Sequence, residues 1–277
     1  MYQFLYPTTI VQAEGFLRDK SNLRILAGGT DLIIALKNRD TACEYLMDIK
    51  KIPELGQIGM TAQGLEIGAA ATINRMIESG LLTGWYNALL QSGKELANVL
   101  LRNRATLAGN ICNASPGGDM LTPCLVLGAR LETISPGGSR QIALKDFFTG
   151  VKKHVLAPNE LVLRTIIPKA GGVSAYRKKK RIRGHDLAQV GVAGSYGADG
   201  GLKLAFGAVA PTPLLLDLGV VEPGRLREKK AEIIQKAVES TSPISDVRSS
   251  KEHRLAMIRY LTGEVIDELL TNMETGV

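Results

Sequence analysis

The chain has 277 residues and a formal net charge of +7, and 45% of its residues are hydrophobic while 5% are aromatic. This length suffices for two or three hydrophobic cores, and the composition is that of a soluble globular protein. No segment approaches the roughly 20 apolar residues of a membrane span. The N-terminal sequence MYQFLYP lacks the basic and apolar regions of a signal peptide, so we expect a cytoplasmic protein.

The cysteines and histidines do not form a recognisable ligand pattern. Cys43, Cys112 and Cys124 lie far apart without a C-x-x-C pair, which argues against a disulfide framework and against a zinc or iron–sulfur motif. The three histidines are scattered, with no second candidate ligand close in sequence. We therefore expect any redox chemistry of this chain to proceed without a metal of its own.

Residues 1–54 have the pattern of a small α/β unit with parallel strands. A Pro-Thr-Thr sequence before an apolar segment predicts a helix over 10–17. A predicted strand over 23–27 then leads through a glycine turn into a helix over 31–38, and another strand follows at 45–49.

Residues 55–169 form a second region, for which we expect an α+β arrangement with mostly antiparallel strands. Apolar and polar residues alternate over 65–69 as in a half-buried strand. A Pro-Gly-Gly turn predicts a hairpin between 131–134 and 140–144. The other expected elements are two helices and a final strand, at 72–79, 85–99 and 161–168.

Residues 170–277 form a third region, which begins at an Ala-Gly-Gly sequence. Three consecutive strands are expected there, at 173–180, 187–198 and 201–210. Two helices should follow, near 226–240 and 249–272. Apolar residues recur at helical spacing on one face of the second helix, which predicts that this face packs into a core.

A glycine turn joins the strand and helix near the start of the chain, in the sequence ILAGGTDL at 25–32. Gly28 and Gly29 can adopt conformations closed to other residues and let the backbone come close to a ligand. Thr30 or Asp31 would cap the helix, whose first N–H groups form an anion site. An ordinary strand–helix turn explains the same residues, so this loop alone does not decide between the two interpretations.

A second glycine-containing segment, RATLAGNICNASPGGD at 104–119, is also expected to be a loop. It contains no histidine or lysine, which indicates ligand binding rather than acid–base catalysis, and we assign no catalytic residue. Neither segment matches the Rossmann or P-loop fingerprint, but two such loops could hold a long diphosphate ligand between them. Short side chains able to hydrogen-bond a ligand follow one another here: Thr106, Asn110, Asn113, Ser115 and Asp119.

Five segments resemble, in order, the FAD-binding medium subunit of the molybdenum hydroxylases, which include xanthine, carbon monoxide and nicotinate dehydrogenase types. They are AGGTDL at 27–32, TLAGNICNASPGGD at 106–119, NELVLRTIIP at 159–168, YRKKKRIRGHDLA at 176–188 and FGAVAPTP at 206–213. The resemblance covers essentially the whole chain. It implies an α+β fold with a two-subdomain FAD-binding unit of the vanillyl-alcohol-oxidase type, at 1–54 and 55–169, and a C-terminal α+β domain at 170–277.

The resemblance also implies which residues hold a noncovalently bound FAD. Residues 25–32 would surround the pyrophosphate with backbone amides, and residues 106–110 would hold its other side. Asp119 would hydrogen-bond the ribityl or ribose hydroxyls, Leu163 would contact the adenine or ring region, and Lys178 would lie near the isoalloxazine and tune its potential. The full predicted set is Ile25, Leu26, Ala27, Gly28, Gly29, Thr30, Asp31, Leu32, Thr106, Ala108, Gly109, Asn110, Asn113, Asp119, Leu163 and Lys178.

One position departs from the family pattern. The family that the chain resembles usually has a glycine pair before the asparagine of the second segment, whereas this chain has Ala108 followed by Gly109. A positive φ at Ala108 would be costly, while a requirement for close approach alone would tolerate the methyl group.

The function implied by the resemblance is an electron relay. Electrons would pass from two [2Fe–2S] clusters on a small partner subunit through FAD to an acceptor, for which NAD is expected. A large partner subunit would carry the molybdenum cofactor and oxidise the substrate, in a dimer of heterotrimers. The substrate pocket would then lie in another polypeptide, and this chain would bind and orient the flavin.

Three other functions stay open at this point. A free-standing FAD oxidase would act on its own substrate, and Cys112 would be the residue available for covalent attachment. The basic run at 177–183 would suit nucleic acid, although it lacks interleaved aromatic residues and suits a solvated face, an anionic cofactor or an acidic partner equally well. A related cell-wall precursor reductase would need an acid for substrate reduction, for which we find no counterpart.

Overall fold

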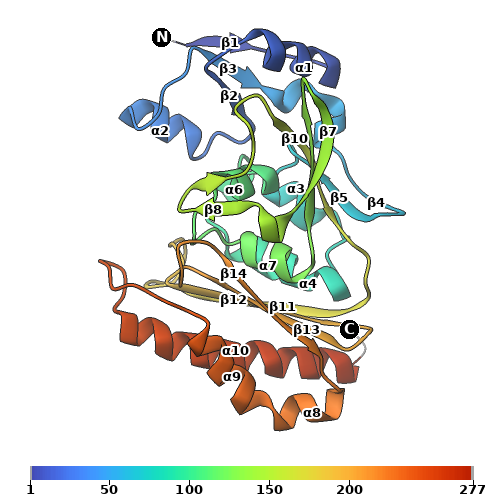
Figure 1. Cartoon of the computed structure of the whole chain (residues 1–277), viewed down its shortest axis with the longest axis vertical. Helices are drawn as coiled ribbons and strands as arrows, with labels where there is room; N and C mark the ends of the chain where they lie inside the picture. Colours follow the sequence, from blue (N-terminus) through green and yellow to red (C-terminus); the bar gives the residue numbers. More distant parts are fainter. Residues whose placement is uncertain (1, 276–277) are drawn as a thin grey trace.

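The computed structural model describes residues 2–275, and its β-sheets follow one another along the long axis of the molecule (Figure 1). The N-terminal sheet has the strand order β1-β3-β2, and its strands are parallel as predicted. The sequence pattern does not reveal β1, whose three residues are too few for an alternation to be recognised. The elements of this part are β1 (Gln3–Leu5), α1 (Ile10–Asp19), β2 (Leu23–Leu26), α2 (Leu32–Asn38) and β3 (Tyr45–Asp48).

The second sheet is antiparallel and has the strand order β4-β5-β10-β6-β7. Its strands are β4 (Ile58–Thr61), β5 (Gly64–Gly68), β6 (Arg130–Ser135), β7 (Gly138–Ala143) and β10 (Leu161–Ile167), and a small hairpin is formed by β8 (Phe148–Gly150) and β9 (Lys153–His154). Between β5 and β6 the chain forms α3 (Ile73–Glu78), α4 (Asn87–Glu95), α5 (Val99–Arg102), α6 (Leu107–Asn113) and α7 (Leu121–Val126). Short 3-10 turns lie at Ile49–Lys51, Pro53–Gly56, Gly84–Tyr86 and Leu144–Asp146.

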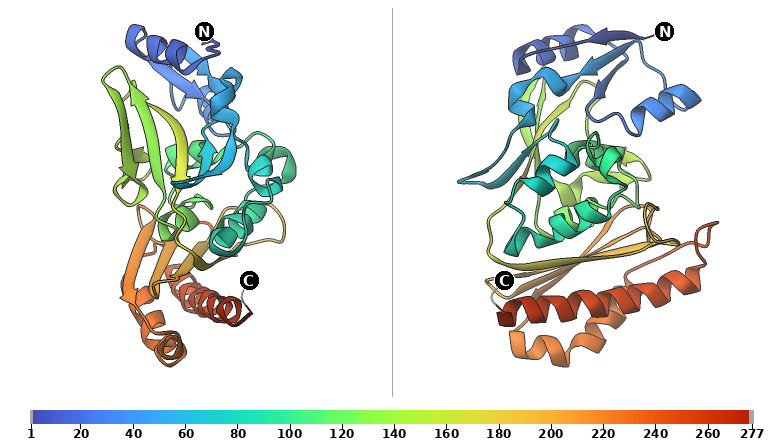
Figure 2. Two further views of the ribbon diagram at one scale, coloured as in Figure 1. Left: turned by 90° about the vertical axis from the view of Figure 1, so that its right-hand side faces the viewer. Right: turned by 180° about the vertical axis from the view of Figure 1, so that it is seen from behind.

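The third sheet is an antiparallel meander in the order β11-β12-β13-β14. Helix α10 covers one of its faces, while α4 and α7 pack against the other, so that the sheet lies between two helical layers (Figure 2). Among the described helices none is long and apolar enough to cross a membrane. The elements are β11 (Gly172–Lys179), β12 (Val190–Gly197), β13 (Gly201–Gly207), β14 (Leu214–Val220), α8 (Pro223–Glu228), α9 (Lys230–Glu239) and α10 (Lys251–Thr275).

Several predicted elements differ from those observed. The helix expected over 85–99 ends at Glu95, because Ala97 has a φ of 49° and turns the chain before α5 begins. The helix expected over 226–240 is divided at Lys229 into α8 and α9. The segment 104–119, expected as a loop, contains helix α6. The sequence pattern also misses β4, β8, β9, β14 and α7. The division into residues 1–54, 55–169 and 170–277 stays a prediction.

Helix α10 packs closely on the third sheet through its predicted apolar face. Ile258, Val265 and Leu269 on this face are fully buried, which confirms the stripe read from the sequence. The close approach depends on Gly194 in β12, where an added Cβ would lie 2.6 Å from Val265 Cγ1 and 3.1 Å from Leu269 Cδ1. Because the sheet has no side chain there, the helix can lie directly on the strand.

Replacing Gly194 with valine tests this contact. The new side chain would push α10 away from the sheet, and we expect the free energy of unfolding to fall by about 1–3 kcal/mol in chemical denaturation. The control is Gly15→Ala in the interior of α1, where nothing lies within 4 Å of the new Cβ. This change should raise the free energy of unfolding by about 0.5–1 kcal/mol. A Gly194→Val protein as stable as the unmodified chain would contradict the packing described.

Candidate functional site

The first glycine loop lies where two segments of backbone touch. Gly29 has a φ of 78°, the left-handed region that favours glycine. A Cβ on Gly28 would lie 2.2 Å from the carbonyl oxygen of Arg104, far too close for a nonbonded contact. The two positions therefore require glycine for different reasons. Gly29 allows the chain to turn, and Gly28 leaves room for the backbone at Arg104, where the second predicted segment begins.

The backbone N–H groups of residues 28–32 donate no hydrogen bond to any other group within residues 2–275. These residues are partly or fully exposed, so their donors are available to a ligand. Asp31 occupies the position before α2, but its side chain does not cap the helix, and neither does that of Thr30. The capping predicted for these two residues is therefore wrong. The Asp31 carboxylate instead accepts a hydrogen bond from Asn113 Nδ2 at 3.2 Å.

The second predicted segment begins with a capped helix. Thr106 precedes α6, and its buried hydroxyl accepts a hydrogen bond from the N–H of Gly109 at 3.0 Å. Ala108 is buried inside this helix and does not have a positive φ. The backbone strain considered for Ala108 is therefore absent, and the alanine suits its helical position better than glycine would.

Two asparagine side chains of α6 hold neighbouring segments in place. Asn110 Oδ1 accepts a hydrogen bond from the N–H of Met120 at 3.3 Å, which ties the end of the 115–119 turn to the helix. Asn113 bonds to Asp31 and so connects α6 with the first glycine loop. Both amides, predicted as ligand-binding groups, make these contacts within the protein.

Asp119, Lys178 and Tyr176 form a buried polar cluster. Lys178 Nζ lies 2.8 Å from Asp119 Oδ2, and the Tyr176 hydroxyl donates to Asp119 Oδ1 at 3.0 Å. The Lys178 side chain is fully buried and that of Asp119 is 10% exposed. The structure thus joins two predicted site residues that are far apart in the sequence. The ammonium predicted as a cation near the flavin ring is neutralised by a carboxylate.

Burial controls the protonation of this cluster. Removal from water raises the pKa of Asp119 above its usual value, and the adjacent Lys178 ammonium opposes that shift. The pKa of Tyr176 is raised well above its usual value, first by burial and then by the Asp119 charge. Tyr176 therefore keeps its proton at neutral pH and remains a donor. An ionised carboxylate has further lone pairs with which to accept ligand hydroxyls.

Leu163 lies apart from these groups, in the middle of β10. Its side chain is buried in the core, and its carbonyl oxygen accepts a hydrogen bond from the N–H of Ala69 at 3.0 Å. Helix α6 packs on the same strand. The structure therefore places Leu163 in a strand against which part of the second segment packs.

Sequence reasoning missed several residues that shape this site. Lys50 Nζ lies 3.1 Å from the carbonyl oxygen of Ala27 and brings a cation to the first loop. Ser92 donates to the backbone oxygen of Asp119 at 2.8 Å, and Gln91 accepts from the N–H of Tyr176 at 2.6 Å. Gln91 and Ser92 both lie in α4, and nothing in the sequence of this helix indicated that its polar residues contact the site. Tyr176 stood at the start of a recognised motif without an assigned role.

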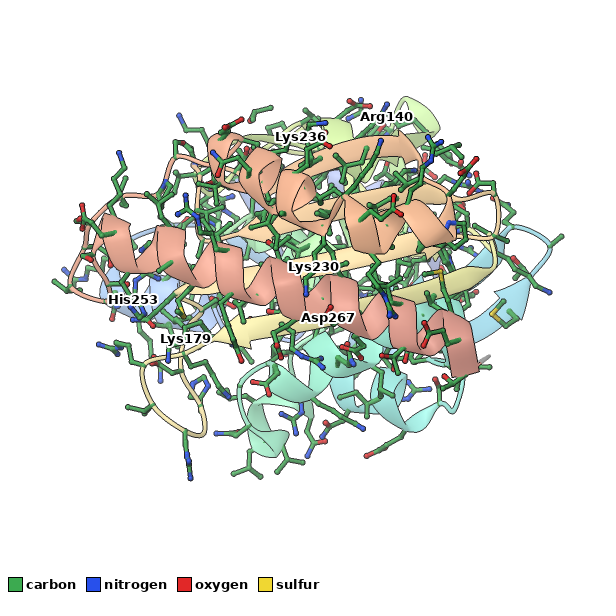
Figure 3. All side chains as sticks on the ribbon, turned by 90° about the horizontal axis from the view of Figure 1, so that it is seen from below. Arg140, Lys179, Lys230, Lys236, His253 and Asp267 are labelled. Carbon is green, nitrogen blue, oxygen red and sulfur yellow. The ribbon has the colours of Figure 1, made fainter. Side chains whose placement is uncertain are left out.

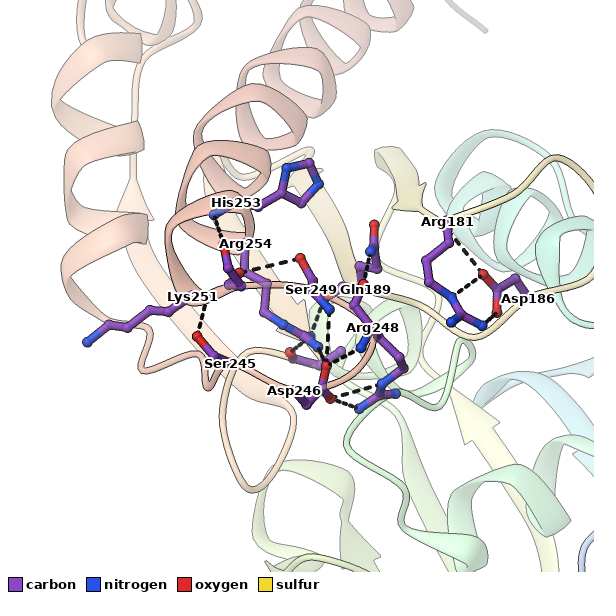
Figure 4. Close-up of polar contacts among 12 residues, drawn as sticks. Arg181, Asp186, Gln189, Ser245, Asp246, Arg248, Ser249, Lys251, His253 and Arg254 are labelled. Atoms are coloured by element: carbon purple, nitrogen blue, oxygen red, sulfur yellow. Dashed lines mark hydrogen bonds and ion pairs between the residues drawn. The ribbon is translucent and has the colours of Figure 1, made fainter.

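Most of the basic run is paired with acids. Besides the Asp119 pair, Arg177 contacts Glu268 at 2.7 Å, Lys180 contacts Glu95 at 2.7 Å and Arg181 contacts Asp186 at 3.2 Å (Figure 4 shows the last pair). These ion pairs reduce the positive charge that residues 177–183 present to a polyanion. The run serves largely to connect β11 with neighbouring elements.

Known proteins share this architecture and these segments. The family model described as the FAD binding domain in molybdopterin dehydrogenase matches residues 1–170. An Escherichia coli O157:H7 protein named xanthine dehydrogenase FAD-binding subunit is 33% identical over 271 residues, which cover 94% of this chain and 93% of that protein. The carbon monoxide dehydrogenase medium chain of Afipia carboxidovorans is 31% identical over 278 residues, covering 96% of each.

Solved structures agree over nearly the full length. A chain of quinoline 2-oxidoreductase from Pseudomonas putida 86 superposes with a TM-score of 0.88 at 25% identity, covering 98% of both chains. A chain of carbon monoxide dehydrogenase from Hydrogenophaga pseudoflava gives 0.86 at 27% identity, covering 96% of both.

The α+β fold and the matches to these relatives define a flavin-binding oxidoreductase subunit. The chain belongs to the family of FAD-binding domains of molybdopterin dehydrogenases, and its cofactor is FAD. The family resemblance and the α+β fold predicted from the sequence are thereby confirmed. The residues present fit the cofactor, because unpaired N–H groups at 28–32 suit a pyrophosphate.

Replacing Gly28 with alanine should separate the two segments. The methyl group would collide with the Arg104 carbonyl, and we expect the apoprotein to lose about 1–3 kcal/mol of unfolding free energy. The control is Gly117→Ala, whose Cβ would lie 3.8 Å from Ala208 Cβ in ordinary contact, and this apoprotein should keep its stability. Chemical denaturation of both variants measures the difference. Equal stability of the two would show that the segments do not depend on this contact.

Proposed function

We propose that the chain is the electron-transfer subunit of a molybdenum hydroxylase. It would receive electrons from [2Fe–2S] clusters on a small partner subunit and deliver them through its FAD to an acceptor, for which we propose NAD. A large partner subunit would hold the molybdenum cofactor. The complex would work in the cytoplasm, with this chain divided into units at 1–54, 55–169 and 170–277.

One observation carries the proposal: unpaired backbone donors at residues 28–32 occur in a chain of the FAD-binding family. FAD takes electrons singly from iron–sulfur centres and gives up a pair as hydride, which suits a converter between such centres and NAD. The relatives named as subunits or medium chains of larger dehydrogenases support partner chains. Within residues 2–275 no group of three or more His, Cys, Asp or Glu side chains that could hold a metal ion is found.

In this proposal the chain's own residues bind and orient the cofactor. The N–H groups of residues 28–32 would donate to the pyrophosphate, and those of Leu107 and Ala108, which donate to no group within residues 2–275, would approach from the other side. Asp119 would accept from sugar-chain hydroxyls. Leu163 would support the ring or adenine region from β10. The remaining proposed contacts are Ile25, Leu26, Ala27, Thr106, Gly109, Asn110, Asn113 and Lys178.

A free-standing oxidase with covalently bound FAD is less well supported. Cys112 is the thiol nearest to the proposed site in sequence, and burial raises its pKa to about 12. A thiol with this pKa is protonated at neutral pH and a poor nucleophile. The noncovalent cofactor of the first proposal needs no such residue.

Acid precipitation of the purified protein tests the mode of binding. We expect the flavin absorption bands to move to the supernatant, because no covalent bond holds FAD in place. The Cys112→Ala variant should carry the same amount of flavin as the unmodified chain. Colour that stays in the pellet of the unmodified protein, and disappears in Cys112→Ala, would establish a covalent flavin. A protein that binds no added FAD would overturn the proposed function.

The proposed acceptor is tested by anaerobic stopped-flow mixing of the FAD-loaded chain with NADH. Electron transfer is reversible, so a chain built to reduce NAD should have its flavin bleached rapidly and with saturation in NADH concentration. A matched reaction with NADPH measures selectivity for the cofactor. Slow bleaching without saturation, with rapid reoxidation by a quinone or oxygen, would replace NAD by another acceptor. Purification of the whole complex, followed by iron and molybdenum analysis, tests the proposed partners.

A further inference from the structure

Arg254 is a charged side chain buried at the start of α10, with an exposed fraction of 1%. One of its terminal nitrogens donates to the backbone oxygens of Gln189 at 2.6 Å and Ala208 at 2.8 Å. The other donates to Asp246 Oδ1 at 2.8 Å. Figure 4 shows this arginine between the loop that precedes α10 and the end of the third sheet. The arginine thus joins the ends of β12 and β13 to the helix.

Asp246 is held firmly as the partner of this arginine. Its carboxylate also accepts hydrogen bonds from the N–H of Arg248 at 2.9 Å, the N–H of Ser249 at 3.2 Å and the Arg248 guanidinium. Burial opposes its charge, but the bonds from Arg248 and Arg254 outweigh this effect and hold the pKa of Asp246 below its usual value. The carboxylate therefore stays ionised at neutral pH, and Arg254 has a fixed counter-charge.

Ala208 connects the buried arginine with the second segment. Its φ is 62°, a left-handed conformation that is uncommon for any residue other than glycine. Its carbonyl oxygen accepts from Arg254, while its N–H donates to the carbonyl oxygen of Pro116 at 2.7 Å. Both sides of one strained residue are thus fixed, one by the buried arginine and the other by the turn at 115–119.

The turn at 115–119 rests directly on the ends of these strands. A Cβ on Gly117 would lie 3.8 Å from Ala208 Cβ and 3.9 Å from the Ala188 oxygen. A Cβ on Gly207 would lie 3.4 Å from the Pro116 oxygen. Asp119, at the end of the turn, continues into the cluster with Tyr176 and Lys178. A continuous path of contacts therefore connects Arg254 with Asp119.

We propose that Arg254, held by Asp246, is a positioning residue for FAD: through Ala208 it sets the place of the 115–119 turn and of Asp119. The inference rests on the proposed FAD-binding role of Asp119. A buried ion pair is a poor source of stability, since well-packed apolar residues of similar volume are often equally stable. The fork of the guanidinium, in contrast, fixes two carbonyls and a carboxylate in one geometry. Its contribution should therefore appear in the geometry of the turn.

The test compares Arg254→Met with Ile258→Ala, one turn further along α10. Ile258 is fully buried in the core between α10 and the third sheet, so its truncation lowers the melting temperature of the apoprotein while leaving the hydrogen bonds to Ala208 in place. FAD affinity is measured by quenching of flavin fluorescence on titration with apoprotein. Amide hydrogen exchange is followed in the peptides that contain Ala208 and residues 115–120.

We expect Arg254→Met to weaken FAD binding by about tenfold and to speed exchange at the Ala208 amide. Ile258→Ala should keep its FAD affinity and the protection of that amide even at an equal loss of melting temperature. Arg254→Lys, which keeps the charge but not the fork, should be intermediate. Asp246→Asn should weaken FAD binding and speed exchange at the Ala208 amide in the same direction as Arg254→Met. If Arg254→Met does not fold, the comparison uses Arg254→Lys and Asp246→Asn instead.

Equal effects of Arg254→Met and Ile258→Ala on FAD affinity would overturn the inference and leave the arginine with a purely structural role. An unchanged affinity in Arg254→Met would do the same. Failure of the unmodified chain to bind FAD would instead contradict the proposed function. In that case exchange at the Ala208 amide still decides whether Arg254 controls the turn.

Discussion

The candidate site depends on a close backbone contact that only a residue without a side chain permits. At Gly28 the backbone of the first loop lies against the carbonyl of Arg104, two residues before the threonine that caps α6. The parallel unit at the start of the chain meets, at this contact, the helical segment that lies between β5 and β6. The Asn113–Asp31 hydrogen bond reinforces it. These two contacts bring the segments together, although the segments are far apart in the chain.

Charge in this protein is organised mainly by pairing. A basic chain with a run of cations places Lys178 in a buried pair with Asp119, and pairs the buried Arg254 with the partly exposed Asp246. At the surface Lys230 of α9 contacts Asp267 of α10 at 2.6 Å, a pair visible in Figure 3. Exposed pairs of this kind contribute little to stability, typically about 0–1 kcal/mol. The pairs of Lys178 and Arg254 fix geometry, because an unpaired buried charge would be expensive.

Much of the fold follows from patterns that the sequence displays. Periodicity identified α10 and the central strands, and the ordered motifs identified the family. The prediction failed where tertiary contacts override local signals. Gly109 suggested a break, but the hydroxyl of Thr106 caps a helix that runs through it. Ala97 ends a helix without any glycine or proline to announce the turn. The Asp119–Lys178 pair joins residues whose contact no local pattern encodes.

The origin of the Asp119 partners has a consequence for how the chain can be divided. The family match ends at residue 170, yet Tyr176 and Lys178 both lie beyond it, in β11. A fragment that stopped at residue 170 would deprive the Asp119 carboxylate of both partners, and would uncover the apolar faces of α4 and α7 that pack on the third sheet. The segment that defines the family in sequence is therefore shorter than the set of elements that hold Asp119 in place. If Asp119 binds FAD as proposed, the meander supports that site through Tyr176 and Lys178, and a flavin-binding fragment should need to include it.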